Sequence, residues 1–434
     1  MTLGAGALAA AFRAGKDDPV QALDRALAAA DRGRDDHAIL WRRPEARADA
    51  EAAHKRLADG QPLGPLDGIP VVVKDCVDVA GLPTTNGTRF LQTPATTDAT
   101  LVTRLRGAGA VIFAKTNMHE LGILPLGMNP HHGTPRNPWD GERMPGGSSS
   151  GTAVAVASGI AAVGIGTDAG GSVRVPACFN GLVGLKPAYG AVPDDGVAKL
   201  TDDLDHAGPI GWTVDDVSDV FEVIAARSVD RALAAGRAAV LDDLFLGADE
   251  EVVGPVREAI SRCFPGPVSL RTPMCRHAYA AEAVIVGWDA SRRFPREQRA
   301  QLGPDARLIL ALGEGFTPDD RRRADGARRA IIAELAAALE QADVLVAPMT
   351  GCLAPVMHPD DRQGLLDMRT TAQVAALSFL GNLTGLPSIT VPCFTGAQPV
   401  GLQIIARDEA RALAAARLVE RAYGPRRPPR WHGA

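Results

Sequence analysis

Two runs rich in glycine and serine carry the side chains of this 434-residue chain that are best suited to covalent chemistry. The first reads Gly-Gly-Ser-Ser-Ser-Gly over residues 146–151, and the second reads Gly-Thr-Asp-Ala-Gly-Gly-Ser-Val-Arg over residues 166–174. A serine hydroxyl is a poor nucleophile until a base removes its proton. Gly170 and Gly171 allow backbone conformations in which successive N–H groups converge on one point, as an oxyanion hole requires.

Lys74 is the candidate base, and it lies at the end of the β-branched run 69–75. Burial beside Val71, Val72 and Val73 would disfavour the charged ammonium, so the neutral amine can accept a proton near neutral pH. A lysine at the end of a strand is usually solvated. The hypothesis therefore depends on Lys74 lying beside both serine runs.

A strand–helix–strand unit is expected to hold Lys74 in place. The runs 69–75 and 111–116 are short and β-branched, as strands are. Between them, Asp98 is a good N-cap for a helix that extends to about Arg106. This order predicts a right-handed parallel crossover.

The two serine runs are expected to meet at one edge of the same sheet. A small-residue helix at about 151–160 rises by roughly 15 Å, and a strand at 163–168 returns by roughly 20 Å. The chain therefore runs out and back between Ser148 and Ser172. Both serines can then end beside the strand that carries Lys74.

The rest of the chain is expected to complete a single α/β domain over residues 1–424. Its parts are N-terminal helices at 1–60, a catalytic core at 61–200, a variable helical region at 201–340, and C-terminal strands with a closing helix at 341–424. The C-terminal strands are expected at 344–347, 388–391 and 400–405, and the helix at 409–423. Residues 425–434, with three prolines, are expected to form a loose tail.

Composition excludes several classes of function. A net charge of −5 and a pI near 6.0 give no electrostatic footprint for nucleic acid or an anionic membrane. The six cysteines are scattered and form no C-x-x-C pair, which favours reduced thiols in a cytoplasmic protein over disulfides or a zinc site. No cofactor or metal is expected.

Three rival motifs fit the serine runs less well. Residues 147–151 match G-x-S-x-G with Ser149 as nucleophile, but that elbow needs a preceding strand, and 137–145 is a polar loop containing proline. Residues 164–169 match a loose dinucleotide fingerprint, but Pro176 follows where a helix would have to begin. No lysine follows the glycines of 146–151, so this run is not a phosphate-binding loop.

Taken together, these motifs resemble the amidase signature family. The densest match covers residues 145–190, and others fall at 68–85, 115–120, 382–387 and 399–403. The resemblance implies a large mixed sheet of about ten strands surrounded by helices. It also implies an amidase, a hydrolase of carbon–nitrogen bonds in linear amides, that works through an acyl-enzyme.

The resemblance implies a role for each matching residue. Ser172 would be the nucleophile, and Ser148, in a cis peptide bond with Gly147, would relay its proton to Lys74. Ala169 stands where many family members have threonine or isoleucine, which leaves its backbone donor intact. The oxyanion hole would consist of the backbone N–H groups of Ala169, Gly170, Gly171 and Ser172. Supporting residues would be Ser149, Thr167, Asp168 and Arg174, and the substrate pocket would include Met118 and Gly147.

The expected partner is a small-molecule amide. A homodimer is common among proteins of this kind, and the sequence itself does not indicate the oligomeric state. Two alternatives stay open: an amidotransferase subunit that supplies ammonia to a partner, and a hydrolase of ureido or biuret-type amides. Amidotransferase subunits of the family usually carry a longer C-terminal helical extension, which favours the hydrolase. Small polar amides, ureido compounds and aryl amides all remain candidate substrates.

Overall fold

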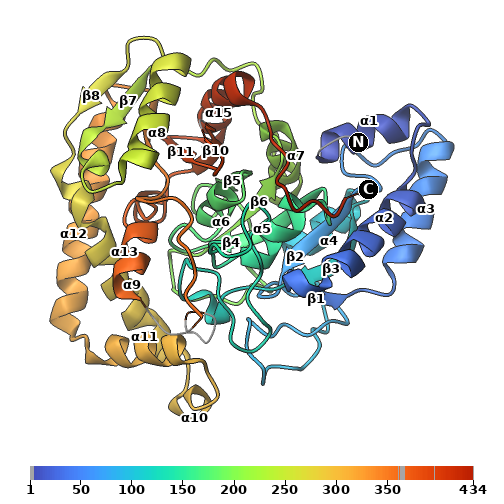
Figure 1. Cartoon of the computed structure of the whole chain (residues 1–434), viewed down its shortest axis with the longest axis horizontal. Coiled ribbons are helices and arrows are strands. Elements are labelled where there is room, and N and C mark those ends of the chain that lie inside the picture. Colours follow the sequence, from blue (N-terminus) through green and yellow to red (C-terminus); the bar gives the residue numbers. More distant parts are fainter. Residues whose placement is uncertain (1–3, 360, 362–366, 395, 434) are drawn as a thin grey trace.

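An eleven-stranded mixed sheet runs through the residues that the computed structural model describes, which are 4–359, 361, 367–394 and 396–433 (Figure 1). The strand order is β1-β3-β2-β4-β6-β5-β10-β11-β9-β7-β8. The α/β prediction is therefore confirmed. The strands are β1 Ile39–Arg42, β2 Pro70–Lys74, β3 Val111–Thr116, β4 Val163–Asp168, β5 Val183–Lys186, β6 His206–Gly211, β7 Ala238–Leu241, β8 Val268–Leu270, β9 Val344–Pro348, β10 Ser388–Pro392 and β11 Gly401–Ala406.

Helices cover the sheet on both faces and at its ends (Figure 1). None in the described part of the chain combines the length and apolar character needed to cross a bilayer. They are α1 Ala5–Arg13, α2 Pro19–Arg32, α3 Ala46–Ala58, α4 Thr100–Gly107, α5 Ser150–Ala157, α6 Arg174–Phe179, α7 Val214–Ala225, α8 Glu250–Cys263, α9 Ala278–Arg293, α10 Arg296–Arg299, α11 Pro304–Gly315, α12 Pro318–Leu339, α13 Met368–Ala375, α14 Leu380–Thr384 and α15 Glu409–Tyr423.

Strand β2 lies between β3 and β4 and is parallel to both. All five of its residues are buried, as expected for a parallel strand covered on both faces. The crossover helix α4 begins at Thr100, and its N-cap is Ala99. The prediction of Asp98 as the cap is wrong, because its carboxylate accepts the Ala80 N–H at 2.8 Å and pairs with Arg106.

Helix α5 is buried on every side, and its small residues allow this. A Cβ on Gly151 would come within 2.6 Å of backbone atoms of Ala38 and Asn117, so glycine is needed for the close approach. The first serine run, residues 146–151, leads into this helix and lies beside the ends of β2 and β4.

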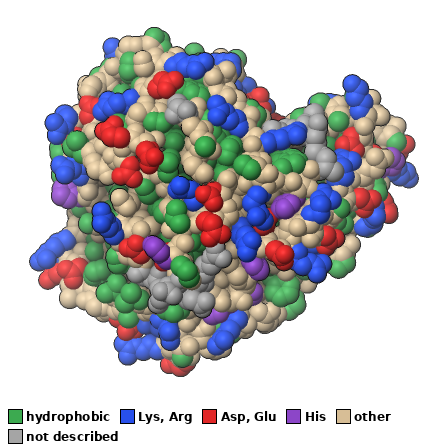
Figure 2. All heavy atoms as spheres, in the orientation of Figure 1, with side chains coloured by type: hydrophobic (Ala, Val, Ile, Leu, Met, Phe, Trp, Pro, Cys, Tyr) green, Lys and Arg blue, Asp and Glu red, His purple; other side chains and the backbone are tan. Residues whose placement is uncertain are grey.

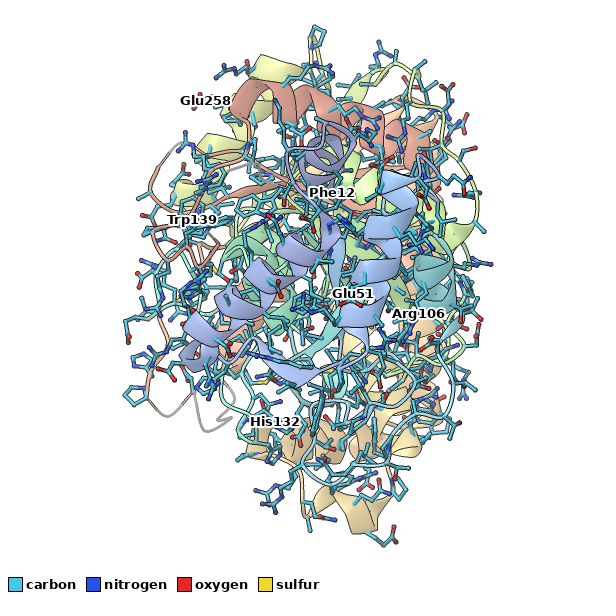
Figure 3. The ribbon with its side chains drawn as sticks, turned by 90° about the vertical axis from the view of Figure 1, so that its right-hand side faces the viewer. Phe12, Glu51, Arg106, His132, Trp139 and Glu258 are labelled. Atoms are coloured by element: carbon cyan, nitrogen blue, oxygen red, sulfur yellow. The ribbon has the colours of Figure 1, made fainter. Side chains whose placement is uncertain are left out.

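The two ends of the chain differ from the sequence prediction. Residues 1–60 contain a strand as well as helices, because β1 pairs antiparallel with β3. The segment predicted as a loose tail is held in place through its described residues: Arg430 and His432 both bind Asp36, and the Trp431 ring meets the Trp212 ring edge-on. Figure 3 shows the N-terminal helices, marked by Phe12 and Glu51, on the side of the molecule that is at the right in Figure 1.

The region 201–340 combines three strands with a layer of helices. Strands β6, β7 and β8 join the sheet, while α9 packs against α11 and α12. Helices α9 and α11 approach closely at two glycines, since a Cβ on Gly313 would lie 2.0 Å from the Gly287 carbonyl oxygen. In Figure 2, hydrophobic side chains gather at the lower left, where Figure 1 places α9 and α11.

Candidate active site

Lys74 and Ser148 meet at the carboxyl end of β2. Lys74 Nζ lies 2.7 Å from Ser148 Oγ and 2.7 Å from Thr167 Oγ1. The parallel pairing of β2 with β4 accounts for the second contact, because it brings Thr167 beside the end of β2. Lys74 and Ser148 are almost completely buried.

Burial lowers the pKa of Lys74, although the acidic groups of Cys76, Asp205 and Asp168 act in the opposite direction. A buried ammonium has lost its hydration, so the neutral amine is favoured relative to a solvated lysine. A neutral amine has a lone pair. It can therefore accept the proton of the Ser148 hydroxyl across their 2.7 Å contact.

Ser172 lies on the loop between β4 and α6, and it faces two cavities. The first is small and is lined by Ser148, Ser172, Thr167 and Met118 among others. The second is a larger apolar cavity that shares several lining residues with the first. Ser172 therefore lines one cavity together with Ser148 and also borders a space where an acyl group can lie.

Ser149 ties the two serine runs together. Its backbone N–H donates to the Ser172 carbonyl at 3.1 Å, and its hydroxyl donates to the Thr167 carbonyl at 3.2 Å. The Thr167 N–H donates back to Ser149 Oγ at 3.3 Å. Its neighbours Gly147 and Ser148 are joined by a cis peptide bond. Ser149 is thus placed to hold the loops together rather than to face substrate.

The backbone donors expected for an oxyanion hole are not equivalent. The N–H of Gly171 donates to Asp168 Oδ1 at 2.7 Å, so this donor is engaged within the loop, whereas no such bond within the described part of the chain is assigned to the other three. Gly171 has a φ of 115°, which a residue with a side chain rarely adopts. Ala169, Gly170 and Ser172 all line the apolar cavity.

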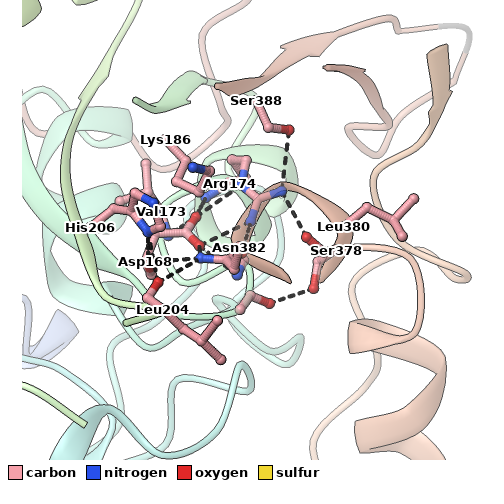
Figure 4. A network of polar contacts seen from close by, with 12 residues as sticks. Asp168, Val173, Arg174, Lys186, Leu204, His206, Ser378, Leu380, Asn382 and Ser388 are labelled. Atoms are coloured by element: carbon pink, nitrogen blue, oxygen red, sulfur yellow. Dashed lines mark hydrogen bonds and ion pairs between the residues drawn. The ribbon is translucent and has the colours of Figure 1, made fainter. Parts of the chain in front are cut away.

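A buried network of polar side chains holds the second serine run, residues 166–174, in position (Figure 4). The Arg174 guanidinium makes a bidentate contact with Asp168, with both N···O distances at 2.9 Å. The same guanidinium reaches the C-terminal part of the chain through Ser378, Asn382 and Gln403. Residues more than 200 positions apart in sequence thereby fix the position of the second serine run.

The network keeps Asp168 ionised. Burial alone would raise its pKa, but the charge and hydrogen bonds of Arg174, with the N–H of Gly171, lower the pKa overall. Breaking such a pair would leave a buried charge uncompensated.

We expect Arg174→Met to lower the free energy of unfolding by about 3–5 kcal/mol, because the Asp168 carboxylate would lose its charged partner inside the protein. Urea-induced unfolding followed by circular dichroism measures this. The control is Arg322→Met, which removes an exposed ion pair with Asp319 and should cost less than about 1 kcal/mol. Equal losses in the two variants would contradict a special role for the buried pair.

The apolar cavity beside Ser172 is of modest size. Its volume is about 200 Å³, which is below the range of sites for drug-sized ligands and suits a small or medium-length acyl group. Helices α9, α11 and α13 supply half of the residues in its wall. Its apolar lining includes Ile123, Leu124, Tyr279, Val286, Ile309, Leu312, Phe316, Met368 and Phe379.

The two residues predicted for the substrate pocket have different positions. Met118 lines the small cavity beside Ser148. Gly147 lines neither cavity, and its N–H donates to the Pro125 carbonyl at 2.7 Å. A Cβ on Gly147 would lie 2.5 Å from the backbone nitrogen of Gly127, so this position packs against backbone instead.

No histidine among the described residues lines either cavity. His119, which directly follows Met118, is buried with its ring 3.0 Å from Asp305. Lys74 is the basic side chain that contacts Ser148, so the geometry offers lysine and not histidine as the base.

Sequence reasoning missed several residues of the site. Asp205 and Cys76 line the small cavity, and Glu282 lies in the wall of the apolar one. Glu282 had one detectable signal. It is the acidic member of the face formed by positions 279, 282, 283, 286 and 287, which a helical period places together. Asn382 and Gln403 fall in motifs that were recognised but given no role.

Comparisons with known proteins agree with this geometry. The family model described as Amidase matches residues 21–236 and 275–411. A glutamyl-tRNA(Gln) amidotransferase subunit of Symbiobacterium thermophilum is 35% identical over 404 residues, covering 81% of this chain and 82% of that protein. A fatty acid amide hydrolase of Medicago truncatula is 33% identical over 423 residues, covering 88% of this chain and 70% of that protein.

A solved structure described as an amidase has the same fold. It superposes with a TM-score of 0.88 at 33% identity, covering 96% of this chain and 99% of that chain. The chain therefore belongs to the amidase family, and the resemblance to the amidase signature is confirmed. It is an amidase-family enzyme that acts on carbon–nitrogen bonds.

Proposed function

We propose that this protein hydrolyses linear amides with an apolar acyl group, with Ser172 as nucleophile and Ser148 and Lys74 as its proton relay. The observation that carries the proposal is the 2.7 Å contact between Lys74 Nζ and Ser148 Oγ, at a cavity that Ser172 also lines. A buried lysine with a lowered pKa supplies the base that a serine nucleophile needs.

In the first half-reaction, Lys74 accepts the Ser148 proton while Ser148 accepts the proton of Ser172. Ser172 Oγ then attacks the amide carbon, and the carbonyl oxygen becomes an oxyanion. The N–H groups of Ala169, Gly170 and Ser172 are the proposed donors to this oxyanion.

Collapse of the tetrahedral intermediate breaks the carbon–nitrogen bond. The relay returns a proton to the leaving nitrogen, which departs as ammonia or an amine. Water, activated by the same relay, then attacks the acyl group on Ser172 and releases a carboxylic acid. Asp168 and Arg174 act by holding the loop, and neither is proposed to touch substrate.

The apolar wall of the larger cavity indicates the substrate class. Medium-length alkyl or aryl acyl groups would bury apolar surface against Val286, Ile309 and Phe379, which stabilises binding. Ureido and biuret-type compounds carry several N–H and C=O groups, and a wall that is mostly apolar would leave most of them without partners. This favours the amide over the ureido alternative. Six free cysteines favour a reducing compartment, and we propose the cytoplasm.

A panel of amides tests the proposal on the purified chain. Ammonia release should be measured from octanamide, a phenylalkyl amide, acetamide and biuret, with Ser172→Ala as the blank. We expect kcat/KM for the two apolar amides to exceed that for biuret by at least about tenfold, because each buried methylene contributes about 0.8 kcal/mol. Activity confined to biuret would contradict the substrate class. No release from any amide would favour the amidotransferase alternative.

A further inference from the structure

Glu282 is an acidic side chain in an apolar wall. It lies on α9 with an exposed fraction of 1%, and it lines the same cavity as Ser172 and Gly170. A Cβ on Gly170 would come within 2.0 Å of Glu282 Oε1, so the carboxyl group stands directly over the loop that presents Ser172. The ring of Phe379 is the other close neighbour of that position.

Glu282 has no partner among the described residues that would explain its burial. Its Oε2 is buried and makes no hydrogen bond with any described residue. The two arginines whose charges reach it are engaged elsewhere: Arg174 binds Asp168, and Arg328 binds Asp203 and donates to the Leu383 carbonyl. A buried polar group without a partner destabilises the fold, so its presence calls for another explanation.

The carboxyl group of Glu282 is expected to be protonated. Burial raises its pKa well above the usual range, and the negative charge of Asp168 raises it further. A protonated carboxyl has an O–H to donate. In an apolar cavity, the group that satisfies such a donor is a neutral acceptor on the ligand.

We propose that Glu282 is a specificity-determining residue that donates a hydrogen bond to a neutral acceptor, an ether or carbonyl oxygen, in the acyl chain of the substrate. This deepens the proposed amide hydrolysis and rests on it. The acyl group would then be apolar overall, with one oxygen a few atoms from the scissile carbonyl, because Glu282 stands over Gly170 beside Ser172.

An oxygen scan of the acyl chain tests this. Octanamide is compared with a set of positional isomers that each have oxygen in place of one methylene beyond the α-carbon, and with the matching amines, which are cationic at neutral pH. The enzymes are the wild type, Glu282→Gln, which keeps a neutral donor, and Glu282→Met, which is apolar and unbranched. The readouts are kcat and KM from ammonia release, and the Tm of each variant.

We expect one oxygen isomer to be preferred over octanamide by about tenfold in the wild type and in Glu282→Gln, as one hydrogen bond would give. Glu282→Met should lose that preference through KM while still hydrolysing octanamide. Its Tm should equal or exceed that of the wild type, because a buried group without a partner is removed.

Four results would overturn the inference. Equal losses on all substrates with a lowered Tm in Glu282→Met would indicate a structural residue. A preference for the cationic analogues that Glu282→Gln abolishes would indicate a carboxylate that binds amines. Octanamide hydrolysis with no preferred oxygen isomer would remove the inference and leave the proposed function intact. No hydrolysis of any compound in the series would remove both.

Discussion

Ser172→Ala is expected to lower kcat/KM for amide hydrolysis by about 10⁴-fold or more, because the acyl-enzyme has no other oxygen on which to form. The loss should fall on kcat, since the apolar cavity that binds the acyl group is untouched. The nucleophile itself can be observed directly. A fluorophosphonate should add one covalent label to the wild type, and peptide mass spectrometry should locate it at Ser172.

Ser149→Ala is the matched control for this variant. Ser149 lies in the first serine run, and its hydroxyl binds Thr167 backbone atoms and not Lys74. Ser149→Ala should therefore keep fluorophosphonate labelling at Ser172, with a smaller loss of activity from the loosened loop. Labelling at Ser149 in the wild type would favour the nucleophile elbow and contradict the proposed mechanism.

Lys74→Met is expected to lower kcat/KM by about 10³-fold at pH 7, the scale of a lost general base. Wild-type kcat/KM should rise with pH as Lys74 loses its proton and then reach a plateau. The lowered pKa of Lys74 places this rise below the pH at which a solvated lysine titrates. In the variant, residual activity should rise with hydroxide concentration without a plateau, so the defect should shrink at high pH.

Stability supplies a second readout for Lys74→Met. The pKa of Lys74 is lower in the folded protein than in the unfolded chain, so this lysine makes folding less favourable at every pH below the pKa of the unfolded lysine. That cost diminishes as the pH rises towards the pKa of the unfolded lysine. The variant lacks the cost, so we expect its Tm at pH 7 to equal or exceed that of the wild type. Low activity is then not a folding defect.

Lys115→Met is the control for removing a buried lysine. Lys115 lies on the neighbouring strand β3, but its Nζ binds the Pro83 carbonyl at 2.6 Å and Thr84 Oγ1 at 2.9 Å. Its loss should lower Tm, because Asp75, 3.6 Å away, would lose its charged neighbour. It should leave the shape of the pH profile unchanged. A Lys74→Met enzyme with wild-type activity at pH 7 would remove lysine from the mechanism.

The sequence by itself determined the elements that carry the site. Residue types fix local structure: β-branched runs specified β2, β3 and β4, and the small residues after Ser149 specified a helix that can be buried on all sides. The order of these elements then placed Lys74, Ser148 and Ser172 at one edge of the sheet. Resemblance to the amidase signature added their roles.

The tertiary structure alone decided which atoms meet. A sequence could not show that the Gly171 N–H turns to Asp168, or that Arg174 joins it to residues beyond 377, since both depend on long-range packing. It also could not show that Asp98 binds Ala80 instead of capping α4.

Glu282 shows most clearly the difference between what the sequence predicts and what the tertiary structure adds. On the sequence it is one acidic residue among helical residues, and most such residues are solvated. Only the packing of α9 against α11 and the second serine run encloses it beside Gly170. Local motifs therefore suffice to identify the proposed nucleophile and its base. The residues proposed to bind substrate become apparent only from contacts between distant parts of the chain.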